Sequence, residues 1–189
     1  MKTPDGTNTS LQEAQRQCFI LTVSSQDTSA AFISAFINYI LEHEDSRSKV
    51  CAEILQFEES QRLSLPIVTY QETVEMPYFM ACVHETLRLS PPISVILPRY
   101  APTGGMYLNG VWISEKVELG ANPYVIHQST KIFGSDADKF RPERWLGDAQ
   151  QVRLMHRFSF AFGYGSRKCL GKHIALFESQ KFCVQVNGP

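Results

Sequence analysis

Residues 160–171 of this chain read FAFGYGSRKCLG, and the interpretation of the whole sequence rests on them. A loop rich in glycine leads here to Cys169, where a helix is predicted to begin. The N–H groups and the macrodipole at a helix start favour a thiolate, and Arg167 and Lys168 add positive charge beside it. Side chains that would keep a flat ligand away from the backbone are missing at Gly163, Gly165 and Gly171. The stretch therefore predicts an anionic sulfur that faces a large planar group, with a buried free cysteine beside a glycine turn as the alternative.

A long helix is predicted over residues 11–41. Ser10 and Glu13 have the spacing of a capping box, and about 30 helical residues extend over roughly 45 Å. Residues 18–41 are apolar, and Asp27 is their only formal charge. An aspartate at the middle of a bilayer costs about 2.5–3.5 kcal/mol. We therefore interpret the segment as a helix through a protein core, and a membrane span is the alternative.

The remaining elements are shorter. Further helices are predicted over residues 46–58 and, after a first-turn Pro77, over residues 78–89. Strands are predicted over residues 94–100 and 106–117, with a hairpin turn at Asn109-Gly110. A short helix is expected over residues 121–126, and residues 129–151 have too little periodicity for anything but an ordered loop. The predicted fold class is mainly α with a small antiparallel β-sheet.

The pattern F-x-x-G-x-R-x-C-x-G in residues 162–171 resembles the haem-binding signature of the cytochromes P450. The matching residues are Phe162, Gly165, Arg167, Cys169 and Gly171. The resemblance implies that the cofactor is heme b (iron protoporphyrin IX), that Cys169 is the thiolate ligand of its iron, and that Gly163 lies against it. The chain is identified as the C-terminal portion of this fold, of a fungal or eukaryotic type.

Two further motifs resemble signatures of the same family. Glu85 and Arg88 lie at i and i+3 on the helix that follows Pro77, where an isolated pair would be a surface ion pair worth about 0.2–0.5 kcal/mol. Residues 140–145, FRPERW, resemble the meander signature. The resemblance implies that Arg144 completes a buried cluster with Glu85 and Arg88, and that this cluster holds the cysteine loop rigid.

Residues 24–29, SSQDTS, resemble the family segment that passes over the distal face of the haem. The resemblance implies that Thr28 and Asp27 handle protons during the activation of dioxygen. Ser24 and Ser25 stand where the family has small residues, and serine can hydrogen-bond back to a helix carbonyl and bend the helix. A polar break in a core helix is the alternative.

Other residues receive smaller roles. Arg99 stands where the family places a partner of a haem propionate, a role that it would share with Arg167, and residues 93–97 would line the substrate cavity. The histidines have no metal-ligand spacing, so ordinary structural roles are expected for His43, His84, His127, His156 and His173.

The formal net charge of −1 gives no basis for binding nucleic acid. The resemblance implies insertion of an oxygen atom from O2 into a lipophilic small molecule, as in secondary metabolism, with electrons from NADPH through an NADPH-cytochrome reductase. Relatives of this type sit on the endoplasmic reticulum membrane, but no membrane anchor is recognised in this chain, so its compartment stays open.

Residues 1–189 are interpreted as one partial domain, with the N-terminal half and the extreme C-terminus of the fold missing. We expect apolar faces of the long helix to meet water and the chain alone to be poorly soluble and inactive. Three functional hypotheses follow: a haem-thiolate monooxygenase, a truncated and catalytically inactive fragment, and a thiol-dependent hydrolase that uses Cys169.

Overall fold

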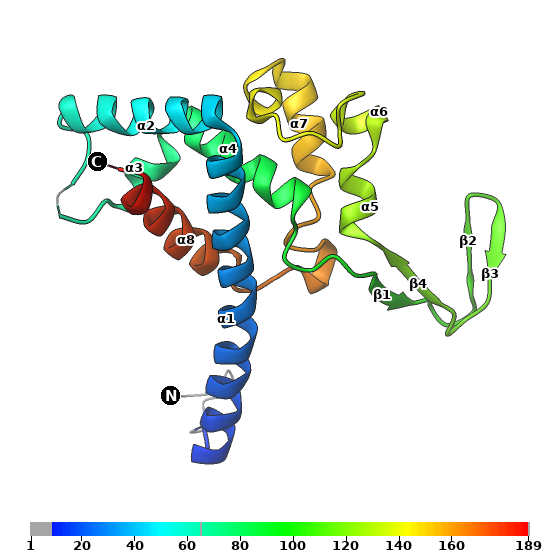
Figure 1. Cartoon of the computed structure of the whole chain (residues 1–189). Coiled ribbons are helices and arrows are strands. Elements are labelled where there is room, and N and C mark those ends of the chain that lie inside the picture. The colour runs from blue at the N-terminus through cyan, green and yellow to red at the C-terminus, as the bar shows by residue number, and fades with distance from the viewer. Residues whose placement is uncertain (1–8, 65, 189) are drawn as a thin grey trace.

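The computed structural model describes residues 9–64 and 66–188. Helices dominate, and the strands form two small antiparallel sheets (Figure 1). This confirms the predicted fold class, although the β-structure consists of two separate two-stranded sheets instead of one.

The long helix α1 (Leu11–Glu42) begins as predicted, because Ser10 Oγ accepts a hydrogen bond from the backbone N–H of Glu13 at 3.2 Å. Only its C-terminal third is buried, through Phe32, Phe36 and Ile40. The N-terminal half projects from the rest of the molecule (Figure 1). The predicted path through a core therefore holds for the C-terminal third alone. Across residues 9–64 and 66–188, no helix combines the length and apolarity needed to cross a bilayer.

The main core lies where α1 meets α2 (Glu44–Glu59), α4 (Pro77–Leu89) and α8 (Lys172–Asn187). The rings of Phe36 and Phe79 meet edge to face at 5.6 Å. Buried apolar side chains from four helices fill the space between them: Phe32, Phe36, Ile40, Val50, Ile54, Phe57, Phe79, Cys82, Val83, Leu87, Cys183 and Val184.

The start of α4 is capped by a residue from another helix. Pro77 occupies its first turn as predicted, and Met76 at the N-cap position makes no side-chain hydrogen bond. Glu53 of α2 accepts from the backbone N–H groups of Tyr78 at 3.0 Å and Phe79 at 2.8 Å. A carboxylate there satisfies two free donors and opposes the positive end of the helix dipole.

The strands follow the predicted hairpin closely. β1 (Leu97–Tyr100) pairs with β4 (Glu118–Ala121), and β2 (Met106–Leu108) pairs with β3 (Val111–Ile113), both antiparallel. Asn109 and Gly110, which join β2 to β3, have φ angles of 49° and 81°. Positive φ at both central positions is the type I′ geometry of a two-residue hairpin, so the predicted turn is confirmed.

The short helix predicted over residues 121–126 is confirmed as α5 (Pro123–His127). Further short helices form that the sequence did not predict: α3 (Tyr70–Val74), α6 (Thr130–Phe133), η1 (Pro142–Leu146), α7 (Ala149–Arg157) and η2 (Gly165–Arg167). The prediction of a loop over residues 129–151 is wrong where α6, η1 and α7 occur. The prediction that the last helix begins at Cys169 is also wrong, because α8 begins at Lys172 with Gly171 as its N-cap.

Candidate functional site: a buried glutamate–arginine cluster and an exposed cysteine loop

The structure brings Glu85, Arg88 and Arg144 together in the interior, and we call these three residues the cluster. The Glu85 carboxylate accepts from Arg88 Nε at 2.9 Å and Nη2 at 2.8 Å, both on α4. Arg144 of η1 donates from Nε at 2.9 Å, 59 positions further along the chain. The Glu85 side chain is fully buried, and the two guanidinium groups are nearly so. Burial of these charges is tolerated because each is paired and hydrogen-bonded.

Two neutral donors complete the shell of Glu85. The indole Nε1–H of Trp145 donates to it at 2.8 Å, and the backbone N–H of Arg141 donates at 2.9 Å. Both donors come from residues 141–145, beside Arg144. The single carboxylate therefore anchors the segment that sequence analysis identified as a meander motif.

The remaining guanidinium donors of the cluster hold main-chain carbonyls of residues 127–139. Arg88 donates to the carbonyls of His127 at 2.8 Å, Ala137 at 2.5 Å and Lys139 at 3.1 Å. Arg144 donates to the carbonyls of Phe133, Asp136 and Lys139. The planar fork of arginine allows one side chain to reach several acceptors, so the cluster fixes the path of an irregular segment.

Residues 160–171, here called the cysteine loop, carry the other predicted site residues. The loop closes on itself, because the backbone N–H of Cys169 donates to the carbonyl of Phe162 at 2.9 Å. Gly163 and Gly165 have φ angles of +72° and +71°, a region that other residues adopt only with strain. Cys169 itself is exposed to solvent. The loop therefore presents its sulfur outward from a closed turn.

The electrostatic surroundings of Cys169 are positive. It lies two residues before Gly171, the N-cap of α8, and no side chain caps that helix start. Lys172 lies over the ring of Phe162, with Nζ 5.6 Å from the ring centroid. Burial, together with the charge of Lys168, lowers the pKa of Lys172. The positive end of the α8 dipole and the side chains of Lys168 and Lys172 therefore lie near Cys169 in the chain.

The donor set around Cys169 suits haem better than a bare metal ion. In the part of the chain that the structure describes, no group of three His, Cys, Asp or Glu side chains is placed to hold an ion. A lone thiolate fits a cofactor that brings its other ligands with it. Gly171 lies beside the sulfur, since a Cβ built on it would be 3.9 Å from Cys169 Sγ. The neighbouring Leu170 is 99% exposed and offers apolar contact.

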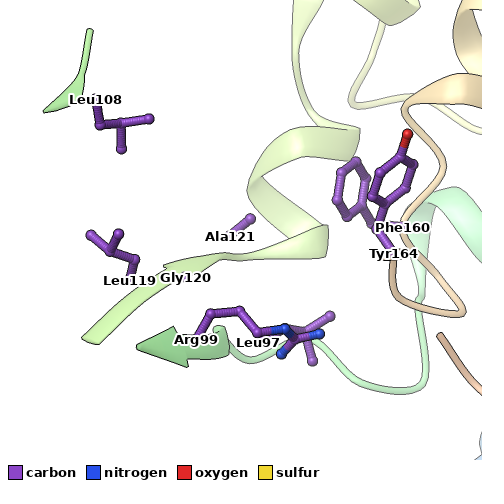
Figure 2. Close-up of a pocket in the computed structure, with 8 residues that line it drawn as sticks. All are labelled: Leu97, Arg99, Leu108, Leu119, Gly120, Ala121, Phe160 and Tyr164. Atoms are coloured by element: carbon purple, nitrogen blue, oxygen red, sulfur yellow. The ribbon is translucent and has the colours of Figure 1, made fainter. Parts of the chain in front are cut away.

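A cavity of about 350 Å³ lies between the β1–β4 sheet and the cysteine loop. Figure 2 shows Arg99 and Leu97 from β1 at one wall and the rings of Phe160 and Tyr164 at another. These two rings stack with centroids 5.4 Å apart. The structure thus brings Arg99 to the same cavity as the cysteine loop. Arg167, the other predicted propionate partner, is exposed at the end of η2.

Asp27 and Thr28 lie on the projecting half of α1. Asp27 is exposed and Thr28 is half-buried, and the helix is unbroken through residues 24–29. The Thr28 hydroxyl donates to the carbonyl of Ser24 at 2.8 Å, and that of Ser25 donates to Thr22 at 3.2 Å. The back-bonding expected of the serine pair is therefore seen at Ser25. Among residues 9–64 and 66–188, no hydrogen bond joins Asp27 or Thr28 to the cluster or to the cysteine loop.

His127 belongs to this site, although the sequence predicted only an ordinary structural role for it. The side chain is fully buried at the end of α5. Its Nδ1 lies 2.8 Å from the carbonyl of Arg88, and its Nε2 accepts from the backbone N–H of Phe160 at 2.9 Å. Burial lowers its pKa to about 4, and the charge of Arg88 acts in the same direction. No local signal reveals this role, since the partners lie 39 and 33 positions away.

Comparison with known proteins identifies the family of this chain. A family model described as Cytochrome P450 matches residues 1–186. The chain is 32% identical to the cytochrome P450 monooxygenase ACRTS1 of Alternaria alternata, over 87% of this chain and 44% of that protein. It is 37% identical to the cytochrome P450 monooxygenase cicH of Emericella nidulans, over 86% and 33% respectively. It is 33% identical to a pisatin demethylase of Fusarium vanettenii, over 92% and 32%. The chain thus spans less than half the length of these curated relatives.

Proposed function

This chain belongs to the cytochrome P450 family, and from that premise we propose that it binds heme b through Cys169 and acts as a haem-thiolate monooxygenase. The observation that carries the proposal is the exposed sulfur of Cys169 on a closed loop beside the positive end of α8. Haem held by Cys169 would supply the oxygen-activating chemistry, and the thiolate would make its iron more electron-rich.

The residues around Cys169 hold the cofactor in this proposal. The cofactor would lie beside the sulfur on a surface without bulky side chains and next to one aromatic ring. This surface is formed by Gly163, Gly165, Gly171 and Phe162. Arg99 and Arg167 pair with the propionates, since the guanidinium fork matches a carboxylate. The cavity that Arg99 shares with Phe160 and Tyr164 supports a role at the edge of the cofactor. The cluster of Glu85, Arg88 and Arg144 keeps the surrounding segment rigid.

Proton supply is assigned to α1. The hydroxyl hydrogen of Thr28 is engaged with the Ser24 carbonyl, so its oxygen is free to accept a hydrogen bond from water. The carboxylate of Asp27, the preceding residue, is exposed to solvent. Together they relay protons from solvent to water held at Thr28 Oγ1.

The substrate and electron donor follow from the family. We propose a lipophilic small molecule of secondary metabolism, with residues 93–97 lining its site. The apolar side chains of Ile93, Val95 and Ile96 are exposed, which suits contact with such a molecule. Members of the family use O2 and a redox partner. For this chain we propose an NADPH-cytochrome reductase.

The thiolate ligand is tested by the spectrum of the full chain, loaded with hemin, reduced and exposed to carbon monoxide. We expect the red-shifted Soret band of thiolate ligation, its loss in Cys169→Ser and its retention in Cys18→Ser, a control at an exposed cysteine of α1. An unshifted or absent band in the unaltered chain contradicts the proposal and favours an inactive fragment. Haem-free ester hydrolysis that disappears in Cys169→Ser favours a thiol hydrolase.

The proton role of Thr28 has a matched control in the same helix. Thr22 donates to Cys18 O at 2.8 Å, as Thr28 donates to Ser24 O at 2.8 Å. In Thr28→Ala we expect product formed per NADPH to fall and released peroxide to rise, whereas Thr22→Ala leaves both unchanged. If both variants formed the same amount of product per NADPH, Thr28 would have no role in proton supply.

A further inference from the structure

The two ring nitrogens of His127 face groups with fixed roles. The backbone N–H of Phe160 can only donate, so Nε2 must accept and carry no proton. The carbonyl of Arg88 can only accept, so Nδ1 must carry the proton. The neutral Nδ1–H tautomer is therefore the form that satisfies both partners. Because the side chain is fully buried, no solvent replaces either bond if it is lost.

Arg88 and His127 hold each other by two exchanged bonds. Arg88 Nη1 donates to the carbonyl of His127 at 2.8 Å, and His127 Nδ1 donates to the carbonyl of Arg88 at 2.8 Å. This exchange fixes both the backbone and the ring of His127. The edge of the Phe133 ring packs against the imidazole at 6.0 Å between centroids and limits its rotation further. Nε2 is thus aimed at one point in space.

That point is the first residue of the cysteine loop. Phe160 lies two residues before Phe162, whose carbonyl accepts from the backbone N–H of Cys169 at 2.9 Å. The backbone N–H of Gly163 also donates to the carbonyl of Phe160 at 2.8 Å. A short chain of hydrogen bonds therefore runs from the cluster, through His127, to the residue that bears the sulfur.

We propose that His127 is a positioning residue, which transmits the rigidity of the buried cluster to the cysteine loop by accepting the Phe160 N–H. The inference rests on the proposed function, because positioning matters through the cofactor that Cys169 binds. It assigns a role to a side chain outside the four motif segments and explains how the exposed cysteine loop keeps its conformation.

Two substitutions test the hydrogen bonds of His127 to Arg88 and to Phe160 separately. Glutamine places an amide oxygen near the Nε2 position and can still accept from Phe160, but it loses the bond to Arg88. Asparagine places an amide N–H near the Nδ1 position and can still donate to Arg88, but it does not reach Phe160. His127→Gln and His127→Asn are therefore matched variants, each of which keeps one hydrogen bond.

The experiment measures two properties of the full chain: amide hydrogen exchange at Phe160, with and without hemin, and the fraction of thiolate-type Soret band after reduction and carbon monoxide. In His127→Asn we expect Phe160 to exchange about five- to tenfold faster and the thiolate fraction to fall. In His127→Gln we expect both properties to stay near those of the unaltered chain.

Several outcomes overturn the inference. Unchanged exchange and spectrum in His127→Asn would show that the loop does not depend on this bond. Equal losses in both variants, or a His127→Gln chain that fails to fold, would assign the effect to the Arg88 contact. If the unaltered chain has no thiolate band but the exchange at Phe160 still separates the variants, the proposed function fails while the hydrogen-bond role stands.

Discussion

The cluster and the cysteine loop differ in burial and in the number of hydrogen bonds that hold them. Glu85 is fully buried and surrounded by donors from Arg88, Arg141, Arg144 and Trp145. Cys169 is exposed, and its backbone N–H donates to the carbonyl of Phe162. The paired charges are thus concentrated in the interior, whereas the sulfur that we propose as the haem ligand lies at the surface. In our proposal the loop takes its order from the cluster.

Removing the charge at the centre of the cluster should have the largest effect. In Glu85→Gln, two buried guanidinium groups lose their counter-charge, and we expect the free energy of unfolding to fall by about 3–5 kcal/mol. The control is Glu75→Gln, whose half-exposed pair with Arg62 at 2.9 Å should contribute about 0–1 kcal/mol. Urea unfolding measures both, and similar changes in the two variants would mean that the cluster is not the stable region.

Acid should weaken the connection between the two regions. The pKa of His127 is lowered to about 4 in the folded chain from 6.5, so the unfolded chain takes up the proton first as pH falls. Stability is then lost between about pH 6.5 and 4, at about 1.4 kcal/mol per pH unit for one such group. His84 has a similarly lowered pKa and contributes in the same way. We therefore expect His127→Gln to remove the contribution of one histidine to the loss of unfolding free energy per pH unit and to leave that of His84.

Urea midpoints measured across that pH range test the prediction. The slope above about pH 7.5 is the internal control, because both histidines are almost fully unprotonated there in the folded and the unfolded chain. If the free energy of unfolding of His127→Gln fell with pH as steeply as that of the unaltered chain, protonation of His127 would not be a cause of the acid destabilisation.

The loss of the cap of α4 should have a smaller effect. The cap stabilises the start of the helix that carries Glu85 and Arg88 and lies outside the cluster. In Glu53→Ala the backbone N–H groups of Tyr78 and Phe79 lose their acceptor, and we expect a loss of about 1–2 kcal/mol in unfolding free energy. Glu59→Ala, at the exposed end of α2, is the control and should stay within about 0.5 kcal/mol. A loss of equal size at Glu59 would point to helix propensity instead of capping.

The loop itself should be the least costly region to perturb. Gly165 has a φ of +71° with open space around its Cα, so Gly165→Ala is expected to cost about 1 kcal/mol through backbone strain alone. Gly147→Ala, at a position with ordinary φ and an ordinary contact, should be close to neutral. Thermal unfolding of the two variants gives the difference, and a harmless Gly165→Ala would mean that the loop does not require this conformation.

The parts of the site that are encoded by local motifs could be predicted from the sequence. It indicated Glu85, Arg88 and Arg144, which the structure places in contact, and the start of α1 and the turn at Asn109-Gly110 followed from capping and hairpin rules. It missed α3 and α7 although each has a local signal. Thr69 and Glu72 form a capping box before α3, and Asp148 caps α7.

Other features depend on contacts between distant residues. The role of His127 requires α4, α5 and the cysteine loop to meet, and the cap at Glu53 requires α2 to lie against the start of α4. The delayed start of α8 follows from the turn that closes Cys169 onto Phe162, which holds residues 162–169 outside the helix. Periodicity and propensity do not contain such information, because it arises only when the elements pack.

The central claim is that Cys169 binds the haem iron through its sulfur, and resonance Raman spectroscopy of the ferric chain loaded with hemin tests it most directly. We predict an iron–sulfur stretching band that shifts when the cysteines carry a heavy sulfur isotope and that disappears in Cys169→Ser. A haem-loaded chain without an isotope-sensitive band, or a band that persists in Cys169→Ser, would contradict the account.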